Sequence, residues 1–212
     1  MATEPAVLLD LDGTLVDSVF LHVIAWDEAF REHGHDVPLW RIHASIGMGS
    51  FRLIPWLVGR QVEEAEEISA MHRQRFLDRA EHLRPTNGAE ALLEDLETRK
   101  VPFLLSTSAP TDVREALLEV LGRTDLEQRT TDAGDVPSAK PAPHLLWQSA
   151  ADLGVDIAQS TLVGDSPWDA EAAHRIGLRT IAVRCGGFGD ERLRSAGAYD
   201  VVDDPRALVG RL

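Results

Sequence analysis

The chain has 212 residues, of which 44% are hydrophobic and 26% charged, values typical of a folded globular protein of one or two domains and not of a disordered chain or a fibre. Its formal net charge is −14, from 21 Lys and Arg against 35 Asp and Glu. A surface this acidic repels phosphate backbones and anionic lipid headgroups, so we expect neither a nucleic acid nor a membrane as a partner.

Cysteine content and the first residues indicate the compartment. Cys185 is the single cysteine of the chain, which excludes an internal disulfide and favours a reducing environment. No apolar run reaches the ~20 residues of a membrane span. The first ten residues contain no basic stretch and continue directly into an apolar segment, unlike a secretory signal. We therefore expect a cytoplasmic protein, working as a monomer or a homodimer.

Apolar segments alternate with amphipathic ones along most of the chain, a pattern typical of a parallel α/β sheet. The pattern predicts, in chain order, a strand at 6–9, a helix at 89–99, a strand at 101–105, a helix from Pro110 to Gly122, a helix at 145–153, a strand at 161–163, a helix at 167–176, and strands at 180–183 and 199–202. Residues 18–83 break this alternation, since they contain helical stretches at 22–32 and 61–79 and no convincing strand. We therefore predict an α/β core, residues 1–17 and 84–212, that carries a helical insertion of residues 18–83.

The segment DLDGTLVDS follows the first predicted strand and places two carboxylates, Asp10 and Asp12, next to each other. In open α/β sheets the ligand site lies at the carboxyl ends of the strands. Two neighbouring carboxylates there repel each other, and a divalent cation is a natural way to compensate them. Taken alone, an acidic strand–turn junction on the surface explains the pair equally well.

Three further polar groups follow later apolar segments. Ser106 and Thr107, in LLSTS, offer hydroxyls and backbone amides that suit a phosphate. Lys140, in SAKPAP, is a lone lysine among prolines. Asp165 and Asp169, in GDSPWD, lie at positions i and i+4 where a helix is predicted to begin. Taken alone, the first group is typical of a turn, the second of a solvated lysine, and the third of a helix cap.

Together and in this order the four segments resemble the haloacid dehalogenase superfamily, in its phosphoglycolate phosphatase and β-phosphoglucomutase branch. The steps from Asp10 to Ser106, then to Lys140 and then to Asp165, are 96, 34 and 25 residues. The long first step matches a helical cap inserted after the first motif. The resemblance implies a Rossmann-like parallel sheet core, residues 1–17 and 84–212, with an all-helical cap domain, residues 18–83.

The resemblance also implies roles. Asp10 would be the nucleophile that forms an aspartyl-phosphate, and Asp12 the general acid and base. The Asp10 carboxylate, the Asp12 carbonyl and the Asp165 carboxylate would bind Mg²⁺. Asp169 would orient the lysine or a metal-bound water. The phosphate would be bound by Ser106, Thr107 and Lys140, the last of which neutralises charge. Because the dehalogenases lack the second acid, the presence of Asp12 argues against cleavage of a carbon–halogen bond.

Several residues of the insertion are weaker candidates. His22 lies in a stretch similar to the start of the cap in relatives and would reach the substrate, although packing at the hinge explains it as well. The glycine-rich segment 46–50 could close over the substrate or be an ordinary helix–helix turn. For His43 and Arg52 a solvated side chain is the simpler interpretation, and for Trp168 it is packing.

We therefore expect a Mg²⁺-dependent phosphatase acting on a small phosphorylated metabolite through an aspartyl-phosphate. A phosphomutase of the β-phosphoglucomutase type shares most of these residues. The glycine directly before Asp165 favours the phosphatase, since mutase relatives often carry another acid there. A non-catalytic phosphoryl receiver or binding module needs neither Asp12 nor a cap. The sequence does not identify the substrate.

Overall fold

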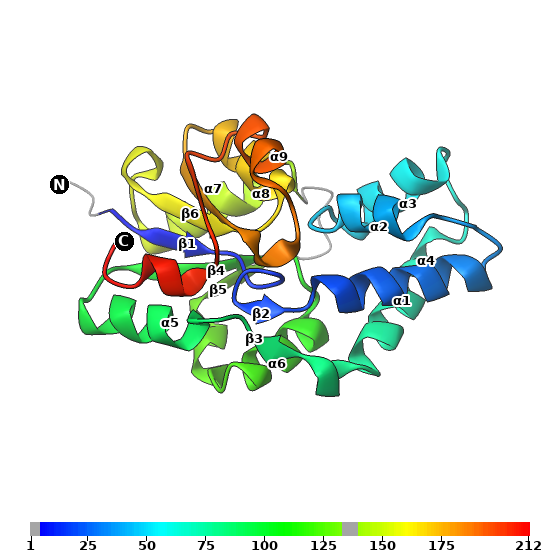
Figure 1. The fold of residues 1–212 in the computed structure, drawn as a ribbon, viewed down its shortest axis with the longest axis horizontal. Helices are drawn as coiled ribbons and strands as arrows, with labels where there is room; N and C mark the ends of the chain where they lie inside the picture. The colour runs from blue at the N-terminus through cyan, green and yellow to red at the C-terminus, as the bar shows by residue number, and fades with distance from the viewer. Residues whose placement is uncertain (1–4, 133–139) are drawn as a thin grey trace.

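The computed structural model describes residues 5–132 and 140–212, so Ser138 and Ala139 of the predicted lysine motif lie outside the described residues. Its centre is a six-stranded parallel sheet (Figure 1). In spatial order the strands are β5 (Thr130–Asp132), β4 (Phe103–Thr107), β1 (Val7–Leu9), β6 (Thr161–Gly164), β7 (Arg179–Val183) and β8 (Asp200–Val202). The predicted α/β class with a parallel sheet is therefore confirmed.

Helices cover both faces of this sheet, as parallel strands require. The helices of the core are α5 (Ala89–Thr98), α6 (Thr111–Val120), α7 (His144–Leu153), α8 (Pro167–His174) and α9 (Asp190–Ser195), with 3₁₀ turns η2 (Thr124–Arg129), η3 (Ile157–Gln159), η4 (Arg184–Gly186) and η5 (Pro205–Leu208). Val7 and Leu9 of β1 pack toward α5 and α6, whereas Leu8 packs toward α7 and α8. This alternation buries both faces of the central strand, which explains its uninterrupted apolar sequence.

The helical insertion, residues 18–83, lies beside the core and contains α1 (Val19–Glu32), α2 (Leu39–Ser45), α3 (Ser50–Val58), α4 (Ala65–Leu77) and η1 (Ala80–His82) (Figure 1). Most of its buried apolar residues form a separate cluster that runs from Val19 to Ile68 and includes the fully buried Phe30, whereas Ala25, Phe76 and Leu83 pack with the core. A short antiparallel pair, β2 (Val16–Asp17) with β3 (Arg84–Pro85), joins both ends of the insertion to the core. The two ends of the helical insertion therefore lie next to each other.

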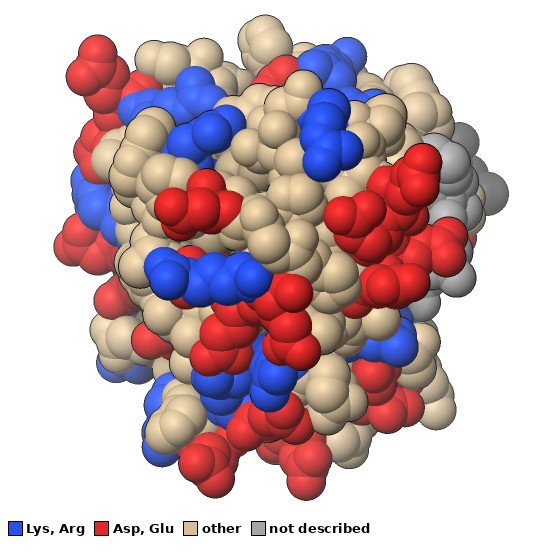
Figure 2. Space-filling view, turned by 90° about the vertical axis from the view of Figure 1, so that its right-hand side faces the viewer, with Lys and Arg blue, Asp and Glu red and all other residues tan. Residues whose placement is uncertain are grey.

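Figure 2 looks at the side of the molecule on which the helical insertion lies and shows acidic and basic groups intermixed there. Ion pairs link α1 to α4 and to the residues that follow it, since Arg75 of α4 pairs with Glu32 and Arg79, just after α4, pairs with Glu28. This face therefore carries no broad basic surface. Among the described residues, no helix is both long and apolar enough to cross a bilayer.

Most predicted elements are found within two or three residues of their expected bounds, whereas the short strands β2 and β3 and four further helices and strands were not predicted. The strand predicted at 101–105 lies at Phe103–Thr107. The sequence analysis did not predict α2, α3, α9 or the edge strand β5. Pro38 precedes α2 and Gly47 follows it closely, glycines flank α3, and α3 contains Pro55, so neither shows a long uninterrupted helical pattern.

Candidate active site

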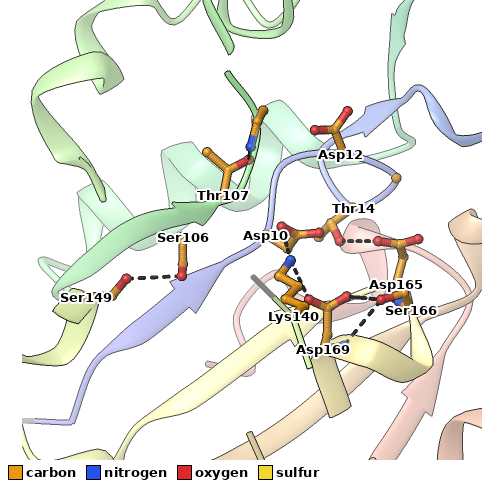
Figure 3. Close-up of polar contacts among 12 residues, drawn as sticks. Asp10, Asp12, Thr14, Ser106, Thr107, Lys140, Ser149, Asp165, Ser166 and Asp169 are labelled. Atoms are coloured by element: carbon orange, nitrogen blue, oxygen red, sulfur yellow. Dashed lines mark hydrogen bonds and ion pairs between the residues drawn. The ribbon is translucent and has the colours of Figure 1, made fainter. Parts of the chain in front are cut away.

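The site lies at the carboxyl edge of the three central strands. Asp10 directly follows β1, and its amide donates to the Val163 carbonyl of β6 over 2.9 Å. Leu9 pairs in register with Leu105 of β4 and with Val163. Because the three strands end at the same edge, the residues that follow them gather there, as Figure 3 shows.

Lys140 joins two carboxylates at the centre of this edge. Its Nζ lies 2.6 Å from Asp10 Oδ1 and 2.6 Å from Asp169 Oδ1. The three side chains are almost entirely buried, with exposures of 4%, 6% and 1% for Lys140, Asp10 and Asp169. At such burial an ion pair is weakly screened by solvent, so the lysine fixes the position of both acids.

The start of α8 holds Asp169 rigidly. Ser166 caps the helix, and its hydroxyl and amide both donate to Asp169 Oδ2, over 2.6 and 3.1 Å. The Asp169 amide donates back to Ser166 Oγ over 3.3 Å, which completes a capping box. Asp169 therefore takes part in the helix cap and also binds Lys140. The interpretations of GDSPWD as a helix cap and as part of a charged site are thus compatible.

Asp165 lies across the cluster from the lysine. It is buried, and Thr14 Oγ1 donates to its Oδ1 over 3.1 Å. A Cβ atom at Gly13 would lie 2.5 Å from Asp165 Oδ2, and Gly13 has a φ of +73°, so both the turn and the close approach require glycine. The ligand atoms of Asp10, Asp165 and Asp169 lie within 4.8 Å of one another.

Burial and mutual repulsion shape the ionisation of these groups. Burial raises the pKa of Asp10 to about 7, with Lys140 opposing and Asp169 adding to the shift. Burial, and next the charges of Asp169 and Asp10, raise the pKa of Asp165 well above its ordinary value. Burial alone would lower the pKa of Lys140, but the two carboxylates raise it. The cluster thus contains more negative charge than one lysine balances.

Asp12 lies in a different environment from Asp10. Figure 3 shows its side chain turned away from the cluster. Ser18 Oγ donates to Asp12 Oδ1 over 2.9 Å, and His22 Nε2 lies 2.9 Å from the same oxygen. Burial alone would raise the pKa of Asp12, but the His22 charge, together with hydrogen bonds from His22 and Ser18, lowers it. These contacts therefore favour the ionised form of this carboxylate.

The predicted phosphate-binding residues lie at the end of β4, next to β1. Ser106 and Thr107 are both buried. Ser106 Oγ accepts a hydrogen bond from Ser149 over 3.1 Å, and Thr107 Oγ1 accepts one from the Ala109 amide over 3.1 Å. Their phosphate-binding role stays a prediction.

Of the weaker candidates, His22 lies beside Asp12, whereas His43 and Gly47 lie where the insertion approaches the core. His22 lies against Asp12, so the structure places it next to a predicted catalytic residue, and its contact with substrate stays a prediction. His43 Nε2 lies 2.8 Å from the Gly186 carbonyl of the core. A Cβ at Gly47 would lie 2.6 Å from Ser166 Oγ and 3.1 Å from Trp168, so this part of the insertion approaches the core closely. The Arg52 side chain makes no hydrogen bond or ion pair within the described part of the chain.

Three residues of the site were not singled out from the sequence. Thr14 and Ser18 lie inside DLDGTLVDS, and their hydroxyls bind Asp165 and Asp12. A signal for both was therefore available in the motif itself. His72 on α4 lies 3.0 Å from His22, and nothing in its local sequence indicates that contact.

A hollow of about 430 Å³ lies where the insertion meets the core. Its lining includes Trp56 of α3 on one side and Trp168, Phe188 and Arg192 on the other. The acids of the site do not line it, so the hollow and the charged cluster are separate features of the same junction.

Comparison with known proteins gives a consistent result. The family model for haloacid dehalogenase-like hydrolases matches residues 5–177. The chain is 31% identical to N-acetylmuramic acid 6-phosphate phosphatase of Pseudomonas aeruginosa, over 96% of this chain and 92% of that protein. It is also 31% identical to phosphoglycolate phosphatase of Cupriavidus necator, over 98% of this chain and 92% of that protein.

Solved structures show the same fold. A hydrolase from Pseudomonas syringae superposes with a TM-score of 0.94 at 31% identity, covering 98% of this chain and 97% of that one. A β-phosphoglucomutase from Clostridium difficile gives a TM-score of 0.82 at 21% identity, covering 97% and 93%, which shows a shared fold alone. With its acids at the carboxyl edge of the sheet and with relatives that are phosphatases, the chain belongs to the haloacid dehalogenase-like hydrolases and is a phosphoric monoester hydrolase.

Proposed function

We propose that the protein hydrolyses the phosphate monoester of a small metabolite with Mg²⁺ and through an aspartyl-phosphate on Asp10. The observation that carries the proposal is the contact of Asp10 with Lys140 at 2.6 Å, directly at the end of β1 and beside Asp165. A buried carboxylate held by a single lysine is positioned as a nucleophile and is not exposed as a surface acid.

The donor set of the site fits a magnesium ion. Three buried carboxylates face a single lysine, so negative charge there exceeds positive charge. Burial, and next the repulsion between the acids, raises the pKa values of Asp10 and Asp165. Carboxylate and carbonyl oxygens are the ligands that Mg²⁺ prefers. When bound, the ion would neutralise charge on the phosphate and the nucleophile.

Asp10, Asp165 and the Asp12 carbonyl would hold the ion. Asp169 fits a different role, because Ser166 donates twice to its Oδ2 and Lys140 contacts its Oδ1. Both oxygens are therefore already engaged by protein groups. We assign Asp169 to the orientation of Lys140.

The chain's own residues divide the reaction between them. The Asp10 carboxylate attacks phosphorus while the leaving oxygen departs on the opposite side, and Lys140 offsets the charge between nucleophile and phosphate. Ser106 and Thr107 bind the phosphoryl oxygens. Asp12 enters the reaction protonated, gives that proton to the leaving oxygen, and then takes one back from the water that hydrolyses the intermediate. Because Asp12 points away from the cluster, it does not compete with Asp10 for Lys140.

Residues 18–83 serve as a cap domain over the core of residues 1–17 and 84–212. The separate apolar cluster of the insertion and its attachment at β2 and β3 support this division. The contacts of His43 and Gly47 with the core support closure of the cap over the site. A cytoplasmic location remains a prediction.

The relatives indicate where the search for a substrate begins. N-acetylmuramic acid 6-phosphate and phosphoglycolate both combine a phosphate ester with a carboxylate, and the proteins named for them are each 31% identical to this chain. Carboxylate-bearing phosphate esters therefore come first in a panel, followed by neutral sugar phosphates and nucleotides.

The experiment measures phosphate release by the purified protein from this panel with Mg²⁺, together with the mass of the intact protein after rapid quenching. We expect hydrolysis without a bisphosphate activator and a transient mass increase that is absent in Asp10→Asn. If the protein instead releases little phosphate and interconverts sugar phosphates once a bisphosphate is added, the phosphatase assignment is wrong and the mutase replaces it.

A further inference from the structure

A line of three side chains connects the helical insertion to Asp12. His72 Nε2 on α4 lies 3.0 Å from His22 Nδ1 on α1, and His22 Nε2 lies 2.9 Å from Asp12 Oδ1. Each ring nitrogen of His22 therefore has its own polar neighbour. His22 is the only link in this line that touches Asp12, so anything that turns the His22 ring also changes the environment of that carboxylate.

Aromatic neighbours fix the planes of both imidazoles. His72 stacks on Trp26, with ring centroids 3.8 Å apart and planes 6° from parallel. His22 stacks on Phe76, with centroids 3.9 Å apart and planes 5° from parallel. Since α1 and α4 each supply one histidine and one aromatic ring, the two helices hold the pair together. Stacking fixes the planes but not the direction in which the nitrogens point.

Hydrogen bonding settles that direction. Asp12 Oδ1 already accepts a hydrogen bond from Ser18, so this oxygen is an acceptor and His22 Nε2 donates to it. His22 Nδ1 is then left to exchange a hydrogen bond with His72 Nε2, whichever of the two carries the proton. Burial, with the His22 charge adding to it, lowers the pKa of His72 well below its ordinary value. A neutral His72 keeps both a donor and an acceptor and imposes no charge repulsion on His22.

We propose that His72 is a positioning residue for the acid–base step: it acts through His22 to keep the His22 Nε2 donor on Asp12. The inference rests on the proposed function, because it assumes that Asp12 protonates the leaving oxygen. A histidine bound to a reacting group commonly depends on the partner of its other nitrogen for orientation. The cap would thus supply part of the acid–base machinery as well as cover the site.

The test compares two substrates in kcat/KM, which reports the steps up to loss of the leaving group. An alkyl phosphate needs a proton on its leaving oxygen, whereas p-nitrophenyl phosphate does not. His72→Phe keeps a ring on Trp26 and removes both nitrogens. We expect it to lower kcat/KM about tenfold for the alkyl phosphate, and much less for p-nitrophenyl phosphate. A general loss of folding would lower both alike.

Two further variants and a control make the result specific. His72→Gln can retain a donor near the Nε2 position, so it should recover most of the alkyl phosphate activity. In a His22→Phe background, His72→Phe should have no further effect, since the link to Asp12 is already broken. His82→Phe is the matched control, because that histidine is 62% exposed and lies after α4. Thermal melting of each variant establishes that it is folded.

Three results would overturn the inference: an equal loss for both substrates in folded His72→Phe, no loss for either, or losses from His22→Phe and His72→Phe that multiply. The proposed function is tested separately by Asp10→Asn. If Asp10→Asn remains active, the covalent mechanism fails. If Asp10→Asn is inactive while His72→Phe behaves like the wild type, only the role of His72 fails.

Discussion

The two halves of the site are built from different parts of the chain. Around Asp10 every charged partner comes from the core: Lys140, Asp165 and Asp169. Around Asp12 the partners are Ser18 and His22, which lie where the helical insertion begins. Asp10 and Asp12 are two residues apart in sequence, yet one belongs to a core cluster and the other is held by the insertion.

This difference also appears in the direction of the two pKa shifts. Burial raises the pKa of Asp10 to about 7, whereas His22 and Ser18 outweigh burial and lower the pKa of Asp12. The core cluster, crowded with acids, could hold a cation, whereas Asp12 is held by histidine and serine. Under the proposed function, binding of the phosphate and metal would depend on the core, and acid–base chemistry would depend on the position of the helical insertion.

The largest expected effect comes from replacing Asp10, the proposed nucleophile, in the part of the site that the core builds. Asp10→Asn keeps the shape of the side chain and removes the attacking charge. We expect turnover to fall by at least about 10⁴-fold, as for other nucleophile replacements. The fold should survive, because the change is isosteric and removes one of several crowded negative charges. Melting temperature and turnover are measured on the same sample, and appreciable turnover by a folded variant would contradict covalent catalysis.

Removal of the metal tests the same cluster of core acids, around Asp10 and Asp165, without a substitution. Chelation should abolish turnover and Mg²⁺ should restore it. Ca²⁺ should inhibit, because it is larger, takes about 6–8 ligands and often binds a carboxylate through both oxygens, which would occupy the attacking oxygen of Asp10. The measurement is phosphate release during metal titration of chelated protein. Activity that persists after exhaustive chelation would exclude a metal at Asp10 and Asp165.

Asp12→Ala tests the other part of the site, in which residues of the helical insertion contact Asp12. General acid–base groups contribute ~10²–10⁴-fold, so we expect a loss of that order with an alkyl phosphate. With p-nitrophenyl phosphate the first step should be less affected, and the aspartyl-phosphate should accumulate because water is no longer activated. Intact-protein mass after quenching measures this species. If the variant hydrolyses both substrates equally poorly and shows no added mass, Asp12 is not the acid and base.

Much of the core side was predictable from the sequence. Apolar segments directly followed by acids or hydroxyls place Asp10, Ser106 and Asp165 at strand ends, and parallel strands bring those ends together. The strand that contains Ser106 begins at Phe103, two residues later than predicted, although the Pro102 carbonyl already accepts a hydrogen bond from the Val7 amide. The order and spacing of the motifs predicted a site from these residues, and the structure brings Asp10, Lys140, Asp165 and Asp169 together; their roles stay predictions.

The insertion side was much less predictable. The contact between His22 and His72 spans 50 residues and depends on how α1 packs on α4, which no local pattern encodes. His43 contacts Gly186, a residue 143 positions away. The edge strand β5 is short and contains two threonines and an aspartate, so it has no apolar pattern to detect. Local signals predict residues at strand ends, but contacts between helices require the packed structure.

The smallest effect is expected where the insertion meets the core, at Gly47. In Gly47→Ala the added Cβ would lie 2.6 Å from Ser166 Oγ. The φ of +97° at this position also strains an alanine backbone. Gly59→Ala is a matched control, because Gly59 has a φ of +80° and nothing within 4 Å of its added Cβ. The positive φ should cost each variant about 1 kcal/mol of stability, and the contact with Ser166 Oγ should add to this cost in Gly47→Ala alone. If the approach of the insertion to the core supports catalysis, only Gly47→Ala should also lower kcat/KM, by about threefold to tenfold, equivalent to roughly 0.7–1.4 kcal/mol. Equal kcat/KM values for the two folded variants would show that this contact does not contribute to the reaction.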